Sequence, residues 1–290
     1  MFQTPVYEFP AAGPVDAKIR VRAGSLTVHA EDRPDVHVTV KPRENNEACQ
    51  EAAAQTKVHF SGSALVIETP ESAKKITFGF NRSKNLDIVV RMPLDGQVNV
   101  KTASADAELL GRYASVNVDA ASGDLRVEEC TGDVVIDTAS GDVHAQQIGG
   151  DLRMKSASGD LRTGRVTGDV RANAASGDIT LGEISGSVEV DTASGDVKIA
   201  AVGASAKVGT ASGEIGIGRI SNGRARFTTA SGDIKVGVVA GTSVWLDLST
   251  MSGRTRSDLA MGQTPVEPTG AQLTLEARSA SGEITVYRAE

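Results

Sequence analysis

Apolar and polar residues alternate along most of this chain of 290 residues, and the alternation returns with a fixed period. The phrase Ala-Ser-Gly, followed by Asp or Glu and then by alternating apolar residues, has its glycine at Gly123, Gly141, Gly159, Gly177, Gly195 and Gly213. A weaker echo falls halfway, at Gly132, Gly150, Gly168 and Gly186. Because a two-residue alternation is typical of half-buried strands, each 18-residue unit predicts two strands and two turns.

Residues 18 apart form columns of similar character, as stacked coils of a repeat protein would require. The column after each Gly-Asp turn is Leu125, Val143, Leu161, Ile179, Val197, Ile215 and Ile234. The column on the opposite strand is Val134, Leu152, Val170, Val188, Ala206 and Ala225. Thr163 is the one polar residue in the interior columns. We therefore predict an all-β fold, a single-chain parallel β-solenoid with two-strand coils, about 4.8 Å apart and right-handed.

Two other architectures share part of this pattern. A triangular left-handed helix built on hexapeptides also has 18 residues per coil, but the nine-residue rhythm of inward positions favours two sheets over three. An antiparallel meander of nine-residue hairpin arms is the other alternative. It does not explain why one corner always carries alanine, from Ala121 to Ala230, while the other carries Ile, Val or Cys, from Cys130 to Val239.

At the Ser-Gly-Asp turns, glycine permits a positive φ and a small alanine lets the chain fold tightly. We expect the serine column, from Ser122 to Ser231, to form a ladder of hydroxyl groups. We expect each aspartate to accept local backbone amides, as in an Asx-turn.

The regularity of the repeat divides the chain into three parts. Residues 1–93 are β-rich but irregular, with strands expected at 18–22, 26–29, 36–40, 64–68 and 86–90. One helix is predicted at 47–55, with Asn46 as its N-cap. Residues 94–252 carry the regular repeat, and residues 253–290 combine a polar excursion at 261–269 with a closing coil.

Composition restricts the function classes. Aromatic residues make up only 3% of the chain, so the core must consist of thin layers of Val, Ile, Leu and Ala. A net charge of −7 disfavours nucleic acid and anionic membranes, which recruit Lys and Arg. Cys49 and Cys130 form no CxxC pair, and we expect one surface thiol and one core residue. With neither an apolar leader nor a membrane span in the sequence, we predict a cytoplasmic protein without membrane insertion, with cell-envelope association as the alternative.

Catalytic, cofactor and metal sites receive little support. The sequence has no GxSxG, HExxH, P-loop or dinucleotide-binding glycine pattern. His29, His37 and His59 all lie in the irregular part and are expected at the surface. The Asp column from Asp124 to Asp233 could suggest calcium, but calcium rolls use turns with several glycines, so hydrogen-bonded turns are favoured over calcium. We predict no catalytic, cofactor-binding or metal-binding residues.

One outward face could bind a partner. It combines a basic column with a neighbouring strip of small side chains. The candidate residues are Arg126, Arg162, Lys198 and Lys235 in the basic column and Gly164, Gly182, Ala200 and Gly218 in the strip. A flat strip beside bases could accept another surface closely; the alternative is a solvated face whose bases offset the aspartates.

The reiterated phrase resembles a known family. The matching segments are Ser122-Gly123-Asp124-Leu125, Ser140-Gly141-Asp142-Val143, Ser194-Gly195-Asp196-Val197 and the opening Ala23-Gly24-Ser25-Leu26-Thr27-Val28. They are similar to the bacterial "putative adhesin" family of unknown function, DUF4097, which is common in actinobacteria. The resemblance covers nearly the whole chain and implies a β-solenoid. Family members in other bacteria are linked to envelope-stress responses, and the resemblance supplies no catalytic residues.

These observations predict a non-enzymatic interaction or scaffold protein, adhesin-like, whose partner is another protein or a second copy. A self-assembling intracellular filament and an envelope-stress-associated scaffold are alternative versions of that role. The rival class is a β-helix enzyme that acts on polysaccharides, and it is disfavoured because the outward face has no row of aromatic side chains.

Overall fold

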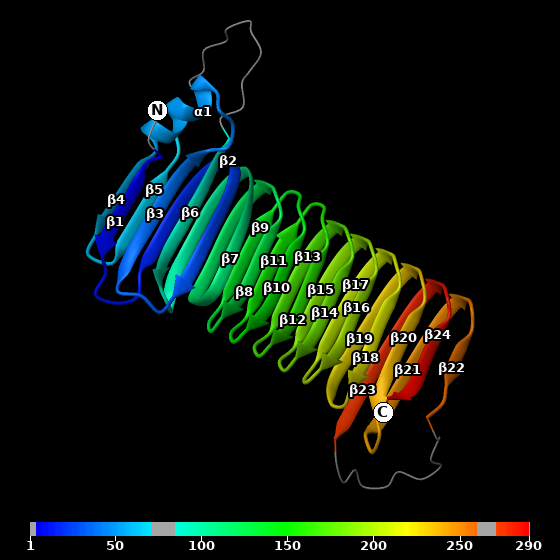
Figure 1. Ribbon diagram of the computed structural model, residues 1–290. Helices are drawn as coiled ribbons and strands as arrows, with labels where there is room; N and C mark the ends of the chain where they lie inside the picture. Colours follow the sequence, from blue (N-terminus) through cyan, green and yellow to red (C-terminus); the bar gives the residue numbers. More distant parts are fainter. Residues whose placement is uncertain (1–3, 71–84, 260–270, 290) are drawn as a thin grey trace, which may run out of the picture. The chain divides into compact units, whose positions relative to one another are not determined.

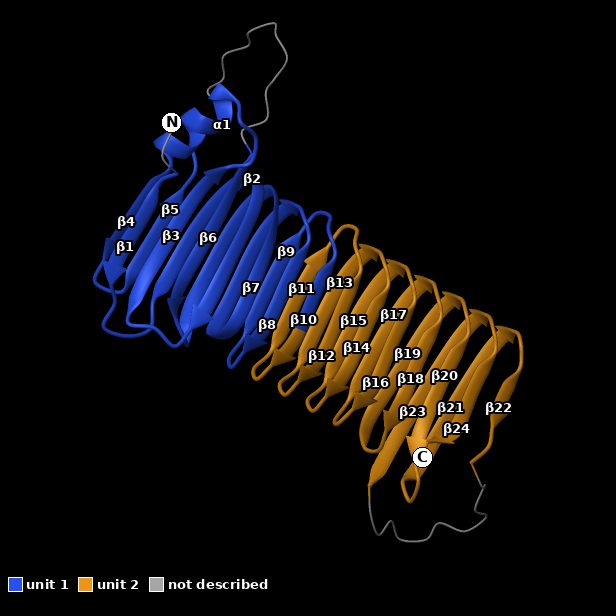
Figure 2. Ribbon diagram, in the orientation of Figure 1, with its two compact units in different colours: residues 1–145 blue, residues 146–290 orange. Residues whose placement is uncertain are grey.

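The computed structural model describes residues 4–70, 85–259 and 271–289, and the chain divides into two compact units, residues 1–145 and 146–290 (Figures 1 and 2). The predicted excursion at 261–269 lies outside the described residues. Unit 1 contains β1 (Val6–Pro10), β2 (Asp16–Glu31), β3 (Asp35–Pro42), α1 (Glu47–Gln55), β4 (Lys57–Ser61), β5 (Ala64–Glu68), β6 (Leu86–Pro93), β7 (Gly96–Ser122), β8 (Leu125–Cys130) and β9 (Val134–Thr138). The unit boundary falls within β10 (Val143–Ile148).

Unit 2 continues with one strand for each half-coil. The strands are β11 (Leu152–Ser156), β12 (Leu161–Val166), β13 (Val170–Ser176), β14 (Ile179–Ile184), β15 (Val188–Ser194), β16 (Val197–Val202), β17 (Ala206–Ser212), β18 (Ile215–Ile220), β19 (Gly223–Ser231), β20 (Ile234–Val239), β21 (Ser243–Ser252), β22 (Thr255–Ser257), β23 (Gln272–Ser281) and β24 (Ile284–Ala289). The structure confirms an all-β solenoid, with one short helix among the described residues.

Unit 2 is built from two parallel ladders. The odd-numbered strands β11 to β19 pair with one another and the even-numbered strands β12 to β20 pair with one another. Partners up to β18 lie 18 residues apart, as in Val170↔Val188 and Ile179↔Val197, and the spacing becomes 19 in Ala206↔Ala225 and Ile215↔Ile234. Strands nine residues apart therefore belong to different ladders. The two-sheet coil is confirmed, and the three-sided helix and the antiparallel meander are wrong. The right hand of the coil stays a prediction.

The last coil in the sequence is not the last one in the ladders. Strand β23 pairs with β19 on one side and with β21 on the other. Its companion β24 pairs with β20 and with β22 in the same way. The C-terminal strands are thus inserted between two coils that precede them in sequence, so β21 and β22 form the outer coil of unit 2 (Figure 1).

In unit 1, strand β2 is likewise inserted between strands that are not its neighbours in sequence. Strand β7 pairs with β2 on one side, and β5 and β6 pair with the first and second halves of β2 on the other. Beyond them the pairing becomes antiparallel, with β3 against β6, β1 against β3 and β4 against β5. The five predicted strands all lie within observed strands. Downstream, β7 pairs with β8 and β9 at the 18-residue spacing, as in Ala107↔Leu125 and Val116↔Val134.

The helix begins where the sequence predicts. Asn46 is the N-cap, and its side-chain oxygen accepts a hydrogen bond from the Cys49 amide at 2.8 Å. Glu47 in the first turn complements the helix dipole. Cys49, Ala52 and Ala53 are buried, because α1 packs on β3 and β6.

The predicted apolar columns form the interior, and Val170, Val188, Ile179 and Val197 are no more than 2% exposed. At the corners, the structure departs twice from the predicted nine-residue rhythm of inward positions. The alanine column is exposed in both units. Because the two-residue alternation of the strand continues into the corner, the inward position belongs to the residue before the alanine. It holds Thr138, Ser156, Ala174, Thr192, Thr210 and Thr229. The other correction concerns the last position of the opposite corner column, where a register shift pairs Ile220 with Val238 instead of Val239.

Most of these inward hydroxyl groups donate a hydrogen bond to a backbone carbonyl of a turn. Ser156 Oγ donates to the Ser158 carbonyl at 2.9 Å, and Thr192 Oγ1 donates to the Ser194 carbonyl at 3.2 Å. Ser156 and Thr192 are buried, so their hydroxyl groups need a partner, and the carbonyl two residues further along the turn supplies it.

Thr163, the polar exception among the predicted interior columns, is buried and its hydroxyl has no hydrogen-bond partner. Replacing it by valine removes an unsatisfied polar group and keeps the side-chain shape. We expect T163V to raise the free energy of unfolding by about 1 kcal/mol, measured by denaturant unfolding. The matched variant T192V removes a hydroxyl that is bonded to Ser194, and it should gain nothing. Equal stabilisation by both variants would contradict this assignment.

Candidate functional site

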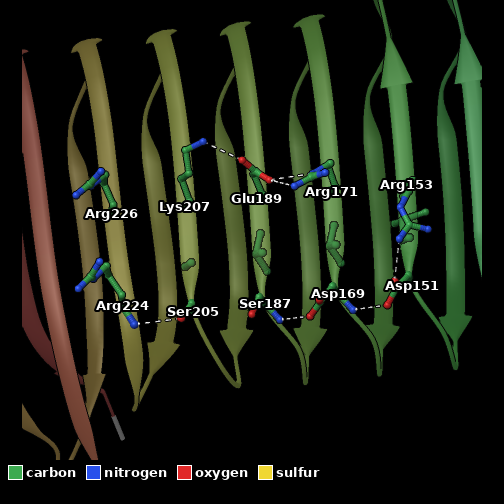
Figure 3. A pocket seen from close by; sticks show the side chains of 14 residues that line it. Asp151, Arg153, Asp169, Arg171, Ser187, Glu189, Ser205, Lys207, Arg224 and Arg226 are labelled. Atoms are coloured by element: carbon green, nitrogen blue, oxygen red, sulfur yellow. Dashed lines mark hydrogen bonds and ion pairs between the residues drawn. The ribbon is translucent and has the colours of Figure 1, made fainter.

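A charged groove crosses the outward face of the odd-numbered ladder in unit 2 (Figure 3). It has a volume of about 630 Å³ and spans strands β11 to β19. We call it the charged groove; its polar lining comprises Asp151, Arg153, Asp169, Arg171, Ser187, Glu189, Ser205, Lys207, Arg224 and Arg226. Its floor contains Val170, Val188 and Ala206, whose side chains lie in the interior column.

Strand register brings these side chains into one row. Arg153 pairs with Arg171, Arg171 with Glu189, Glu189 with Lys207, and Lys207 with Arg226. Each step is one coil, about 4.8 Å, so the row from Arg153 to Arg226 is about 19 Å long. The groove therefore presents charges at a fixed spacing on strands rather than on loops.

Glu189 lies at the centre of an ion-pair cluster in this row. Its carboxylate accepts hydrogen bonds from Lys207 Nζ at 2.8 Å and from the Arg171 guanidinium (Figure 3). These hydrogen bonds, first from Lys207 and then from Arg171, hold the pKa of Glu189 below its ordinary value. The bond to Glu189 raises the pKa of Lys207 in turn. Both charges consequently persist over a wider pH range than those of isolated side chains.

Arginines concentrate at the β19 end of the groove. Arg226 pairs with Glu276 of β23 at 2.9 Å and is 54% exposed. Arg224 is exposed, its backbone amide donates to Ser205 Oγ at 3.2 Å, and its guanidinium has no ion pair among the described residues. The groove lining contains five cationic side chains and three carboxylates. Its local charge is positive on a chain whose net charge is −7.

The aspartate columns connect neighbouring coils. Asp178 Oδ1 accepts from the Asp196 amide and Asp196 Oδ1 accepts from the Glu214 amide, both at 2.9 Å. At the other turn, Asp151 and Asp169 accept from the amides of Asp169 and Ser187 in the same way. The predicted local Asx-turns are therefore wrong. Coils stacked in register place the next coil's amide, not a local one, within reach of each carboxylate.

The serine column behaves similarly. Ser122 Oγ donates to the Ala103 carbonyl at 3.3 Å, and Ser176 Oγ donates to the Ala157 carbonyl at 3.3 Å. The predicted ladder of hydroxyls bonded to one another is wrong, because the neighbouring coil presents a backbone acceptor closer to each hydroxyl.

The face predicted from the sequence lies on the even-numbered ladder. Register places Arg162 beside Thr180, Thr180 beside Lys198, and Gly216 beside Lys235. Arg126 belongs to unit 1 and the other seven candidates belong to unit 2. A shallow groove of about 380 Å³ on this face is lined by residues that include Lys198, Ala200, Gly218, Lys235 and Tyr287.

Both components of this predicted face have structural partners. Arg162 pairs with Asp160 at 2.8 Å, Lys198 with Asp196 at 3.5 Å and Lys235 with Glu214 at 3.9 Å. A Cβ added to Gly182 would lie 2.0 Å from the Gly164 carbonyl oxygen, so glycine is required there by the close approach of two backbones. Tyr287, which the sequence pattern did not place here, lies against Gly237 at the end of the strip.

The charged groove itself was not predicted. Its outward column mixes acids and bases, and the extra residue before Arg226 shifts that position out of the 18-residue phase. The sequence feature that could have indicated the groove is the spacing of its bases: Arg171 follows Arg153 by 18 residues, and Lys207 follows Arg171 by 36.

Other groups give no further site. Cys49 and Cys130 are both buried, so the expected surface thiol is wrong. Burial raises the pKa of the Cys130 thiol. In the described ranges, no group of three or more His, Cys, Asp or Glu side chains is placed to hold a metal ion. No helix in the described part of the chain is sufficiently long and apolar to span a membrane.

Comparison with known proteins gives one family and several structural neighbours. The model of the family described as Toastrack DUF4097 matches residues 17–290. A "putative adhesin" from Parabacteroides distasonis is 14% identical, with a TM-score of 0.36, and the match covers 98% of this chain and 97% of that one. A "putative lipid binding protein" from the same organism is 15% identical, with a TM-score of 0.35 and coverage of 97% and 96%. A "putative adhesin" from Bacteroides fragilis is 11% identical, with a TM-score of 0.33 and coverage of 98% and 97%. No curated protein matches the chain.

Proposed function

The chain belongs to the Toastrack family, DUF4097, and from that premise we propose that it is a non-enzymatic scaffold that binds an acidic protein segment along the charged groove. The excess of cationic side chains in the groove, on an acidic chain, is the observation that carries this proposal. Adhesion at the cell envelope and assembly inside the cell are two settings in which such a scaffold could act.

The groove suits an extended partner better than a compact small molecule. It is open, its charges lie in a row of about 19 Å, and six residues of extended chain span about 20 Å. Arg224 offers a guanidinium without an ion pair among the described residues, and carboxylates are its natural partners. An acidic segment laid across the strands would place its carboxylates near Arg224, Arg226 and Lys207.

The hydrogen bonds of the carboxylates in the charged groove support a non-enzymatic role. Asp151 and Asp169 accept backbone amides of the neighbouring coil, and Glu189 is held by Lys207 and Arg171. Carboxylates engaged in this way stabilise the coil stack, and the pKa of Glu189 is lowered, whereas a general acid needs a raised one.

Fluorescence anisotropy with a fluorescein-labelled hexaglutamate peptide tests the groove. The double variant R224E/R226E reverses two charges at its most cationic end, and we expect about tenfold weaker binding, because several exposed charge contacts are lost or inverted together. Binding to the unmodified protein should also weaken as salt is raised. Hexaglutamate binding that is unchanged in R224E/R226E would contradict the proposal.

The predicted face on the even-numbered ladder supplies a matched control. It is the second candidate surface, and Tyr287 beside Lys235 and Gly218 is the observation in its favour. The double variant R162E/K198E makes the same change in charge as R224E/R226E. If the charged groove is the binding surface, R162E/K198E should alter hexaglutamate affinity less than twofold. The reverse result would assign binding to the face with Arg162 and Lys198.

A further inference from the structure

The outer coil of unit 2 has an edge that pairs with no other strand of the described residues. In the ranges described, β21 pairs only with β23 and β22 pairs only with β24. Ser243 donates its amide to Ala271 on the β23 side. The N–H and C=O groups of one residue point to the same edge of a strand, and those of the next residue point to the other edge. Since Ser243 faces β23, the amides and carbonyls of Val244, Leu246 and Leu248 face the unpaired edge.

This edge is also unusually apolar. Val244, Leu246 and Leu248 are only half-buried, although Leu273, Leu275 and Ala277 in the adjacent strand are no more than 2% exposed. On the outward face of the same strand, Trp245 is 59% and Met251 is 89% exposed. The described residues include one other exposed large hydrophobic side chain, Val6. An unpaired apolar strand of this length is a template for pairing with another strand.

Unit 1 shows how this fold closes an end. There the outer strands β1 and β4 are antiparallel to their neighbours, and Phe9 of β1 stacks on Phe60 of β4 at 5.4 Å. Helix α1 packs on β3 and β6 and thereby buries its own residues Cys49, Ala52 and Ala53. The β21 edge has no such helix and no such aromatic pair among the described residues.

We propose that the β21 and β22 edge binds a second copy of this chain, with the two β21 strands antiparallel around a twofold axis at Leu248. A twofold contact of this kind is closed, so it yields a dimer and not a filament. Both Leu248 residues then exchange amide and carbonyl hydrogen bonds across the axis, since their backbone groups face the free edge.

Side-chain matching selects this register. With the axis at Leu248, Trp245 lies opposite the partner's Met251, and Asp247 lies opposite the partner's Ser249. The two exposed large apolar side chains in the described part of unit 2 would then cover each other, in a favourable contact between sulfur and an aromatic ring. An axis at Asp247 would place two aspartates directly opposite each other, which is destabilising. An axis at Ser249 would leave Trp245 opposite Gly253.

The mass in solution tests the dimer. Light scattering coupled to size-exclusion chromatography of the full chain should give twice 30.0 kDa, and the variant W245K/M251K should give the monomer mass, because lysines oppose edge pairing. A monomeric unmodified chain would overturn the proposal, and so would a mass that rises beyond two copies with concentration. A strand from a different protein as the true occupant would also leave the purified chain monomeric.

Cross-linking tests the register independently of affinity. Opposed residues that do not share hydrogen bonds, such as 245 and 251, have Cα atoms about 4.5 Å apart, which a disulfide can bridge. Within one strand these residues are about 20 Å apart, so a disulfide in W245C/M251C must join two chains. We expect covalent dimer from W245C/M251C after mild oxidation and at least fivefold less from the matched variant W245C/S249C. Equal yields, or no dimer from W245C/M251C, would overturn the register.

Discussion

Replacing Gly177 by alanine is expected to lower the free energy of unfolding by about 3 kcal/mol, through backbone strain and overpacking together. Gly177 has a φ of +112°, where a side chain is strained. The added Cβ would also lie 2.2 Å from the carbonyl oxygen of Gly159 in the neighbouring coil. That oxygen belongs to the short turn between β11 and β12, which are themselves paired with β13 and β14, so it cannot move aside cheaply. Denaturant unfolding of G177A measures the loss.

Gly241 provides the matched control. It also has a positive φ, +82°, but an added Cβ would meet nothing within 4 Å. The variant G241A should therefore lose only the cost of backbone strain, about 1 kcal/mol. If G177A were no less stable than G241A, the close stacking of Gly177 on the neighbouring coil would be contradicted.

The second large effect is expected at Phe227, the bulkiest side chain in its interior column. Phe227 is fully buried and lies between Val208 and Ala277 in adjacent strands. The small Ala277 leaves room for the ring. We expect F227A to lower the free energy of unfolding by about 3–5 kcal/mol, because the rigid sheets on either side cannot collapse into the resulting cavity. Thermal or denaturant unfolding gives the value.

A graded substitution distinguishes a cavity effect from a general disturbance. The variant F227L keeps most of the apolar volume, and it should cost less than about 1.5 kcal/mol. Losses of equal size in F227A and F227L would indicate that the packing described around Phe227 is wrong.

Periodicity alone was sufficient to predict the ladders, because each inward column repeats the same chemistry at 18-residue steps. Local chemistry was sufficient for α1, whose cap is formed by Asn46 and the amide of Cys49. The order of the coils could not be predicted. Leu273 and Leu275 would suit any position in the interior, so nothing in the sequence shows that β23 lies between β19 and β21.

Contacts between coils explain the other differences between the predictions from the sequence and the structure. Asp196 and Ser176 bond to the backbone of the neighbouring coil, and a pattern read along one coil suggests partners within the turn instead. Similarly, the charged groove depends on Arg226, which is out of phase by one residue, and on Arg224, whose surroundings are set by β17 and β19. Such relations appear only when the register is known.

The parallel stacking of positions 18 apart is the claim on which the groove, the ladders and the proposed edge contact all rest. It is tested most directly by two cysteine pairs in unit 2. Thr180 and Lys198 are register partners in β14 and β16, about 4.8 Å apart at Cα, so T180C/K198C should form a disulfide on mild oxidation. Asn173 and Thr180 would face each other in an antiparallel hairpin but lie outward on different ladders here, so N173C/T180C should remain reduced. A disulfide in N173C/T180C and none in T180C/K198C would contradict the account.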